Sequence, residues 1–317
     1  MKKKEILLFG ASGQIGRNLI RKLSKNNYKI TAVTRNIHRT GYILKTQANP
    51  GYLDLVEIKD FNSPRIDELI KNCSICINLI GILYEKNKNQ FKIIHTDLPD
   101  MLSYKANLYK IDKFIHLSSL GIENADDSKY AVSKLEGEKK IFKNFKNSII
   151  LKPSIVYSVD DKFTTNFMTL LSRLPFMPLY YNGLTKFKPI HVTDLVEILY
   201  QIIDGKHKQL ILECVGPEVL SFREILDQLL FSINKKRFLI PLPLPLAKLS
   251  AKVLQLLPKP LLTEDQLTLL KYDNIESGIN KTNYDLGIKS ERVFKTELDK
   301  YSFNWRTGGQ FAKKNDL

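Results

Sequence analysis

Cysteine and long apolar runs are scarce in this sequence. The three cysteines, Cys73, Cys76 and Cys214, are too few and odd in number for a disulfide framework, and they favour a reducing compartment. Cys73 and Cys76 form one C-x-x-C motif without a second pair or suitably spaced histidines. We therefore predict no metal site and interpret Cys76 as a core residue of a strand. The apolar run Ile6–Phe9 is shorter than the roughly 7 residues that a signal peptide needs, and no run approaches the roughly 20 residues of a membrane span. We expect a cytoplasmic chain.

Acidic side chains are in the minority, because 33 Asp and Glu stand against 49 Lys and Arg, a formal net charge of +16. Such a charge can indicate a nucleic-acid partner. The basic residues are scattered, however, and no helix-turn-helix, zinc-finger or RNA-recognition motif accompanies them, so we predict no nucleic-acid binding. A weak attraction to an anionic membrane surface is the alternative that the charge leaves open. The composition, 43% hydrophobic, is that of a globular chain with room for one large α/β domain and a smaller lobe.

Short apolar runs alternate with segments of helical spacing through the first half of the chain. We expect strands at residues 5–9, 29–34, 55–58, 75–79, 113–117 and 148–152. We expect helices at residues 15–23, 66–71, 91–108 and 130–142. This rhythm predicts an α/β fold with a Rossmann-type doubly wound parallel sheet.

The rhythm loosens after residue 155, where we expect a smaller, mainly helical lobe. The spacing predicts a strand at 209–215 and helices at 163–174, 195–203, 221–230, 246–257 and 263–270. Ser221 with Glu224, and Thr263 with Gln266, form capping boxes that open two of these helices. Proline at every second position of Pro241–Leu246 is expected to exclude both a helix and a central strand there.

These elements suggest a division of the chain. We expect a dinucleotide-binding Rossmann domain at residues 1–157, completed by about 188–215. Residues 158–187 and 216–305 are expected to form a small substrate or docking lobe, and residues 306–317 a flexible tail.

The segment after the first expected strand carries a dinucleotide fingerprint. It places glycines at positions 10, 13 and 16, between a strand and a helix. Gly10 allows a tight turn, Gly13 lets backbone N–H groups approach a pyrophosphate, and Gly16 lets the helix pack closely on the strand. The helix N-terminus adds a partial positive charge. The residues expected to bind the pyrophosphate are Gly10, Ser12, Gly13, Gln14, Ile15 and Gly16.

The end of the second expected strand favours NADP(H) over NAD(H). An NAD-binding chain places Asp or Glu there for the ribose hydroxyl, whereas this chain has Arg35, with Arg39 nearby. A guanidinium pairs well with a 2′-phosphate. NAD(H) remains the alternative. Further residues expected beside the cofactor are Asp60, Phe61, Leu79, Ile80, Gly81 and Pro153.

Tyr130 and Lys134 share one face of an expected helix, because residues four apart lie one turn above each other. The ammonium can lower the pKa of the phenol and hold the nicotinamide ribose, while the phenol donates or accepts a proton. Ser119, at the end of the fifth expected strand, is placed to orient a carbonyl. These three are the candidate catalytic residues. The alternative is that Tyr130 and Lys134 are retained for cofactor binding alone.

Together these motifs, with Gly137-Glu138, resemble the atypical and extended short-chain dehydrogenases/reductases over roughly residues 4–215. A narrower resemblance, to the NAD(P)H-binding accessory subunit of respiratory complex I and its alphaproteobacterial relatives, extends to about residue 305. The segments that carry it are Lys113–Ser118, Lys152–Tyr157, Asp161–Phe163, Pro241–Leu246 and Leu262–Gln266.

The narrower resemblance implies a tightly held NADPH in a subunit that stabilises complex I near its quinone-side junction. It also implies complex I subunits as partners and a place on the cytoplasmic face of the inner membrane. No turnover is attributed to that subunit, and its mitochondrial members tend to lose the Tyr-x-x-x-Lys pair, which this chain keeps. Three functions follow: an accessory or assembly subunit of complex I, a free-standing NADPH-dependent reductase or epimerase-like enzyme on a small carbonyl, sugar or lipid substrate, and an NADP(H)-sensing regulator.

Overall fold

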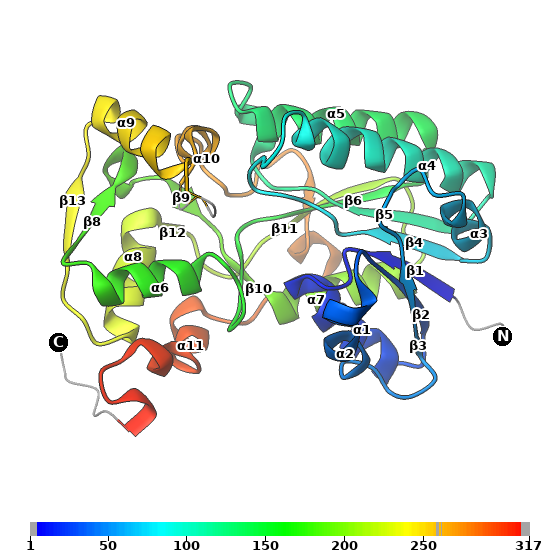
Figure 1. Cartoon of the computed structure of the whole chain (residues 1–317), viewed down its shortest axis with the longest axis horizontal. Helices are drawn as coiled ribbons and strands as arrows, with labels where there is room; N and C mark the ends of the chain where they lie inside the picture. The colour runs from blue at the N-terminus through cyan, green and yellow to red at the C-terminus, as the bar shows by residue number, and fades with distance from the viewer. Residues whose placement is uncertain (1–4, 258–259, 261, 312–317) are drawn as a thin grey trace.

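Eight parallel strands form one sheet (Figure 1). The computed structural model describes residues 5–257, 260 and 262–311. The strands are β1 (Glu5–Phe9), β2 (Lys29–Thr34), β3 (Leu53–Glu57), β4 (Ile75–Asn78), β5 (Lys113–Leu117), β6 (Ile149–Pro153), β11 (Leu210–Cys214) and β14 (Lys281–Thr282). They lie in the order β14-β11-β6-β5-β4-β1-β2-β3. The chain reverses its direction of travel across the sheet between β1 and β4, where sheets of this kind bind ligands at the carboxyl ends of the strands.

Helices cover both faces of this sheet. On one face α1 (Gln14–Lys25) packs against α7 (Val192–Asp204), and on the other lie α3 (Arg65–Lys71), α4 (Leu98–Leu108) and α5 (Lys129–Asn144) (Figure 1). Strands β4, β5 and β6 are buried along their whole length, because a strand between two helical layers has no face toward solvent. Cys76 is one of these buried strand residues, as interpreted. The predicted doubly wound parallel sheet is confirmed.

Helix α2 (Ile37–Lys45) follows β2 and was not predicted from the sequence. It begins after Asn36, whose side chain accepts a hydrogen bond from the backbone N–H of Arg39 at 2.8 Å. Glu57 at the end of β3 accepts a second hydrogen bond, from the N–H of Ile37, at 2.8 Å. A local cap and a carboxylate from the neighbouring strand therefore start a helix whose apolar periodicity alone is weak.

Residues 91–108 were predicted as one α-helix but form two kinds of helix. A π-helix, η1 (Lys92–Asp97), precedes α4. Pro99 has no N–H group, so it cannot donate to the carbonyl of His95, the residue four positions earlier. The regular ladder is interrupted at that point, and π-helical turns of this kind are frequent at functional sites.

Gly137 on α5 lies against the carbonyl group of His95. A Cβ atom at Gly137 would overlap that carbonyl oxygen, so only glycine lets α5 approach η1 this closely. Thr96 fastens the same contact, because its hydroxyl donates to the carbonyl of Ser133 at 2.8 Å. The Gly137-Glu138 pair noted in the sequence therefore has a packing role next to the residues of the candidate site.

Residues 158–187 and 216–305 are called the small lobe below. They form α6 (Thr164–Arg173), β8 (Phe176–Leu179), η3 (Tyr180–Gly183), β9 (Lys186–Phe187), β12 (Leu220–Ser221), α8 (Phe222–Ser232), β13 (Phe238–Pro241), α9 (Leu244–Leu254), α10 (Glu264–Leu269) and α11 (Phe294–Asp299). Most of these elements gather at one end of the molecule (Figure 1). Both predicted capping boxes, at the starts of α8 and α10, are confirmed. Strand β14, within the range expected for this lobe, returns instead to the large sheet beside β11.

The prediction that Pro241–Leu246 excludes a helix was wrong. Pro241 ends β13, which pairs with β8 in a two-stranded sheet, and α9 begins at Leu244 with a proline in its first turn. The first turn of a helix has N–H groups without an intrahelical partner, so proline there removes no hydrogen bond. Gly309–Phe311, within the expected flexible tail, forms a short 3-10 turn, and residues 312–317 lie outside the described residues.

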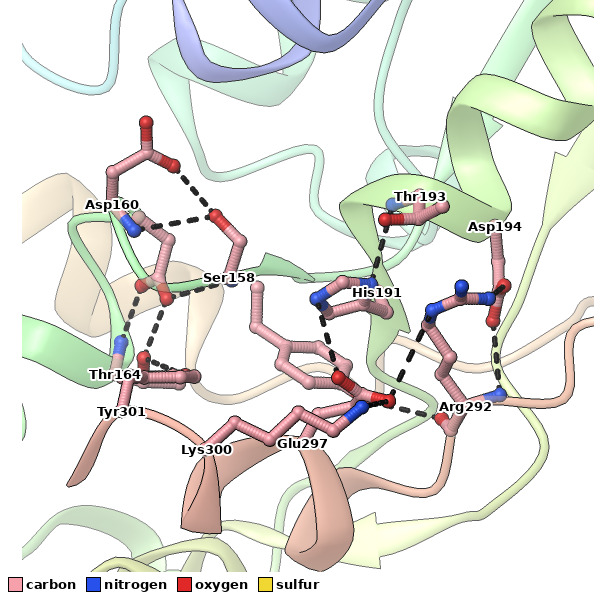
Figure 2. Close-up of polar contacts among 12 residues, drawn as sticks. Ser158, Asp160, Thr164, His191, Thr193, Asp194, Arg292, Glu297, Lys300 and Tyr301 are labelled. Carbon is pink, nitrogen blue, oxygen red and sulfur yellow. Dashed lines mark hydrogen bonds and ion pairs between the residues drawn. The ribbon is translucent and has the colours of Figure 1, made fainter. Parts of the chain in front are cut away.

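A polar network ties the C-terminal part of the chain to the first turn of α7 (Figure 2). Arg292 holds Asp194 through its guanidinium at 2.7 Å and through its backbone N–H at 3.1 Å. Glu297 on α11 pairs with Lys300 at 2.7 Å and lies 4.0 Å from Nε2 of His191. Burial nevertheless lowers the pKa of His191. The network holds α11 of the small lobe against a helix that covers the sheet.

No helix among residues 5–257, 260 and 262–311 has both the length and the apolar character needed to cross a membrane.

The close approach of α5 and η1 predicts that Gly137→Ala is destabilising. The added methyl group must push apart two packed helices, and overpacking of this kind lowers the free energy of unfolding by about 1–3 kcal/mol. Urea denaturation of the purified chain measures the change. Val132→Ala, at an exposed position on the same helix, is the control and should alter stability by less than about 0.5 kcal/mol. Equal stability of the Gly137→Ala and native chains would contradict this account of the contact.

Candidate functional site

The glycine loop connects β1 to α1 at the carboxyl edge of the sheet. Gly10 has a φ of +81°, and a Cβ atom there would lie 2.8 Å from the carbonyl carbon of Leu79. A Cβ at Gly16 would lie 2.6 Å from the carbonyl oxygens of Gly10 and Ala11. Both glycines are therefore required by the fold itself, the first for its backbone conformation and the second for the contact between helix and strand.

Gly13 differs from these two glycines. A Cβ atom there would meet a single protein atom, the carbonyl oxygen of Gly10, at an acceptable 3.4 Å. Gly13 is exposed and precedes the first residue of α1, and no side chain caps that helix. The first N–H groups of α1 have no partner within the helix, and they lie at the positive end of the helix dipole, as an anion site requires. The lack of a side chain at Gly13 leaves room for a ligand, which fits a dinucleotide pyrophosphate.

The first turn of α1 is held by the loop at the start of the small lobe. Gln14 donates from Nε2 to the hydroxyl of Ser158 at 2.8 Å. Ser158 in turn donates to Asp160 at 2.7 Å (Figure 2). Arg17 forms an ion pair with Asp160. The Gln14 side chain, expected beside the pyrophosphate, thus connects the loop to the small lobe. Ser12 is exposed and Ile15 is half-buried against the core.

Arg35 and Arg39 lie where β2 ends and α2 begins. Both are exposed, and within the described ranges neither guanidinium has a hydrogen bond or ion pair. The nearest carboxylate along the strand ends, Glu57, is engaged by the N–H of Ile37 and by Lys59 at 3.1 Å, and the Ile37 bond lowers its pKa. Two arginines are therefore available to an incoming phosphate, while the local carboxylate is occupied.

Asp60 and Phe61 follow β3, at the far side of the glycine loop from Tyr130. The Asp60 carboxylate accepts the N–H of Asn62 at 2.9 Å, and Phe61 packs on the core below. Pro153 ends β6 and is buried, and its carbonyl accepts the N–H of Leu120 at 3.0 Å. Asp60 shapes its own turn, and Pro153 fixes the loop after β5.

Leu79, Ile80 and Gly81 carry the chain from β4 past the glycine loop. The N–H of Leu79 donates to the carbonyl of Phe9 at 3.1 Å, and the N–H of Ile80 donates to the buried side chain of Asn78 at 3.1 Å. A Cβ atom at Gly81 would lie 3.8 Å from Nζ of Lys134. The structure therefore brings together two of the motifs that the sequence identified separately, the segment after β4 and the Tyr-x-x-x-Lys helix.

Tyr130 and Lys134 are both buried on the first two turns of α5, at 8% and 4% exposure. Nζ of Lys134 lies 5.5 Å from the centre of the Tyr130 ring and donates to the carbonyl of Leu117 at 3.4 Å. Burial raises the pKa of Tyr130 to about 12, against the opposing effect of a hydrogen bond with Ser119. Burial lowers the pKa of Lys134 to about 8, although Glu138 partly opposes this. The three candidate catalytic residues therefore share one site.

Two histidines line this site, and neither was predicted as a site residue from the sequence. The ring of His95 stacks on Phe91 and meets the Tyr130 ring edge-on, with centroids 5.3 and 5.2 Å apart. Its Nε2 accepts the N–H of Ile82 at 3.2 Å, and its Nδ1 bonds the hydroxyl of Ser133 at 3.0 Å. Burial lowers the pKa of His95 to about 2, so the ring is neutral. No sequence motif identifies His95, because the π-helical turn that orients its ring could not be predicted from the sequence.

His116 on β5 lies below the same site. It is 1% exposed, its Nδ1 bonds the side chain of Asn78 at 3.2 Å, and burial lowers its pKa to about 3. Lys134 therefore shares this buried site with two neutral imidazole rings and the Tyr130 ring, and Glu138 is the carboxylate that acts on it. Within the described part of the chain, no three His, Cys, Asp or Glu side chains gather as metal ligands would.

Asp265, on α10 of the small lobe, was also missed as a site residue. Its carboxylate accepts hydrogen bonds at the N-terminus of α5, from the N–H of Lys129 at 2.7 Å and that of Tyr130 at 3.2 Å. The available signal was the capping box around it, which explains the helix start but not the contact between lobes. The site as a whole can hold a nucleotide at the glycine loop and move a proton at Tyr130.

The burial of Lys134 predicts a specific dependence of stability on pH. Between pH 8 and about pH 10.5 the folded chain has released a proton from Lys134 that the unfolded chain still binds, so the contribution of Lys134 to the free energy of unfolding rises with pH. The buried thiols of Cys73, Cys76 and Cys214, whose pKa burial raises, contribute with the opposite sign, so the rise is measured as the difference between the native chain and Lys134→Met. The rise from pH 7 to pH 9.5 is roughly 2 kcal/mol. Lys134→Met should lack this rise and be more stable than the native chain at pH 7, as measured by urea denaturation without nucleotide. Lys139→Met, an exposed lysine of the same helix, should keep the rise. A rise retained by Lys134→Met would contradict the assignment.

The chain is similar both to subunits of NADH-ubiquinone oxidoreductase and to enzymes. The 40 kDa subunit of mitochondrial NADH-ubiquinone oxidoreductase from Neurospora crassa is 25% identical over 285 residues, which cover 89% of this chain and 74% of that subunit. A ceramide reductase from Caulobacter vibrioides is 26% identical over 193 residues, which cover 60% of this chain and 57% of the reductase. Among solved structures, MoeE5 in complex with UDP-glucose and NAD matches with a TM-score of 0.69 and 16% identity, over 95% of this chain and 98% of that one.

A family model, described as the NAD dependent epimerase/dehydratase family, matches residues 6–211. The match spans more than half of the chain and includes the glycine loop, Ser119, Tyr130 and Lys134. Its description supports a nicotinamide cofactor as the ligand of the glycine loop. The chain belongs to the NAD dependent epimerase/dehydratase family.

Proposed function

We propose that this chain is an NADP(H)-binding accessory or assembly subunit of respiratory complex I, peripheral on the cytoplasmic face of the inner membrane. The observation that carries the proposal is the similarity to the 40 kDa subunit, which covers 89% of the chain and so extends beyond the family domain into the small lobe. An assembly role needs a surface that partner subunits can contact. In such a subunit the nucleotide would serve as a structural ligand.

The small lobe offers such a surface on β13 and α9. We call it the docking surface, and its exposed apolar side chains are Phe238, Ile240, Leu244, Leu246, Leu249, Val253, Leu256 and Leu257. They lie on adjacent elements at one end of the molecule (Figure 1). Lys248 and Lys252 accompany them on α9. So many exposed apolar side chains on adjacent elements are unusual on a protein without a partner, and the lysines suit a position beside anionic lipid headgroups.

Arg35 and Arg39 support NADP(H) as the nucleotide. When bound, the nicotinamide cofactor would supply hydride-transfer chemistry at Tyr130. Gly10, Gly13 and Gly16 would receive its pyrophosphate, Leu79–Gly81 its ribose, and the two arginines its 2′-phosphate. Charge-assisted bonds to phosphate would engage these two guanidinium groups, which have no partner among the residues that the structure describes.

The second candidate is a reductase or epimerase-like enzyme, and the observation in its favour is the grouping of Ser119 with the buried side chains of Tyr130 and Lys134. The phenol of Tyr130 would exchange a proton with a substrate oxygen that Ser119 orients. Lys134 would hold the ribose and, once charged, favour the phenolate. The similarity to a ceramide reductase favours testing a lipid first among the expected substrate classes.

The NADP(H) preference predicts a selective effect of Arg35→Gln. The loss of a charge-assisted bond to the 2′-phosphate should weaken NADPH binding about 10- to 100-fold and leave NADH binding unchanged. Isothermal titration with each nucleotide measures both affinities. Lys25→Gln removes an exposed charge at the far end of α1 and serves as the control. Tighter binding of NADH than of NADPH to the native chain would overturn the preference.

The accessory-subunit function predicts co-migration of the tagged chain with NADH dehydrogenase activity on a native gel of mildly solubilised membranes, with NADPH released on denaturation. Leu249→Ser with Val253→Ser should abolish co-migration, because it removes apolar area from the docking surface. Ile279→Ser, also at an exposed apolar residue but outside this surface, should not.

Tyr130→Phe discriminates between the two functions in the same experiment. It removes the hydroxyl that the enzyme needs as a proton donor. An accessory subunit does not use that hydroxyl, so it should co-migrate unchanged. A native chain that stays free of the complex and oxidises NADPH only while Tyr130 is present would favour the enzyme instead.

A further inference from the structure

A single segment of the small lobe, residues 263–274, runs from the docking surface to the surroundings of Tyr130. At its start, α10 packs against α9, where Leu267 meets Ala247 and Ala251 in a buried cluster. These small residues occupy the inner face of α9, opposite the exposed leucines of the docking surface. The position of α9 therefore depends on the position of α10.

Asp265 on α10 holds the N-terminus of α5. The first N–H groups of a helix have no partner within the helix, and Asp265 receives two of them, from Lys129 at 2.7 Å and Tyr130 at 3.2 Å. It also accepts the hydroxyl of Ser128 at 3.0 Å, while Ser128 caps the N–H of Ala131 at 3.2 Å. A carboxylate beside the positive end of a 16-residue helix is further stabilised by the helix dipole.

The same segment also encloses the Tyr130 ring. Leu269 and Tyr272 pack on the apolar cluster that contains Tyr130 and Phe91. The hydroxyl of Tyr272 donates to Asp127 at 2.9 Å, two residues before the start of α5. Further along, Asn274 donates from Nδ2 to the carbonyl of Leu120 at 2.6 Å, next to Ser119. Residues 265–274 therefore contact the 120–130 loop at both of its ends.

We propose that Asp265 is a positioning residue that fixes Tyr130 over the nucleotide site and couples that site to the α9–α10 part of the small lobe. The inference rests on the proposed function, which supplies the nucleotide. It deepens that function by naming the contact that couples the nucleotide site to the docking surface. Coupling of this kind is reciprocal. A nucleotide that orders Tyr130 also orders α10, and a partner that immobilises α9 tightens nucleotide binding.

The first test removes the carboxylate. In Asp265→Ala, hydrogen exchange at the amides of Lys129 and Tyr130 should accelerate, and the NADPH dissociation constant should rise about tenfold, the size expected for loss of a helix cap with coupling. Asp265→Asn keeps an acceptor and should show a smaller change in both. Glu264→Gln is the matched control, because Glu264 lies on the same turn but faces Gln255 and Lys252 of the α9 segment.

The second test measures the effect of the Asp265 charge on the pKa of Tyr130, an effect that a purely structural contact would not produce. The negative charge of Asp265 contributes to the raised pKa of Tyr130, so Asp265→Asn should lower that pKa. Titration of tyrosinate absorbance, with Tyr130→Phe in each background subtracted, isolates the one residue. Urea denaturation shows whether each variant is folded, and the conservative Asp265→Asn keeps the test valid if Asp265→Ala is not.

The coupling itself is read from hydrogen exchange in α10. Saturating NADPH should increase protection of the Leu267 amide, which bonds the carbonyl of Thr263 at 2.9 Å, in the native chain and not in Asp265→Ala. If the native chain binds no NADPH, the proposed function fails, while the amide exchange and tyrosinate titration still decide the role of Asp265. If Asp265→Asn, Asp265→Ala and Glu264→Gln match the native chain in exchange at Lys129 and Tyr130, the inference is overturned.

Discussion

The contact between Gly137 and the His95 carbonyl determines how the rest of the candidate site is arranged. It allows α5 to lie close to η1, and this brings Tyr130 and Lys134 against the His95 ring and beside Gly81. The carbonyl is available for the contact because Pro99 has no N–H group to bond to it. One missing donor and one missing side chain thus bring Tyr130 and Lys134 of α5 together with His95 of η1 in one buried site.

That burial has an electrostatic consequence. Burial lowers the pKa of Lys134 toward the physiological range, whereas burial raises the pKa of Tyr130. Without nucleotide the phenol is therefore far from ionising, and the ammonium is costly to keep charged. A bound anionic nucleotide would oppose the effect on Lys134, because its negative charge stabilises the ammonium. The nucleotide consequently acts as a structural counter-ion in either proposed function, and the buried pair alone does not distinguish an enzyme from a subunit.

Much of this arrangement could be predicted from the sequence. The parallel sheet follows from alternating apolar runs, and the glycine loop and the Tyr130–Lys134 pair follow from spacings within one strand–turn–helix or one helix. These signals are local. His95 and Asp265 could not be found in this way, since His95 depends on a π-helical turn and Asp265 acts on a helix more than 130 residues away in the chain. The start of α9 was mispredicted because proline was weighed as a helix breaker without regard to its place in the first turn.

Asp265 is also one of the residues that join the two halves of the molecule. Gln14 with Ser158 and Arg292 with Asp194 connect the sheet and its helices to the small lobe near α1 and α7, and Asp265 connects them near α5. The first two connections hold helices that carry no candidate catalytic residue. The third holds the helix that carries Tyr130 and Lys134, through a segment whose other end supports the docking surface. If an accessory subunit descended from an enzyme of this family, this is the connection through which the former active site would continue to matter, because a nucleotide that orders α5 also orders the surface that meets the partner.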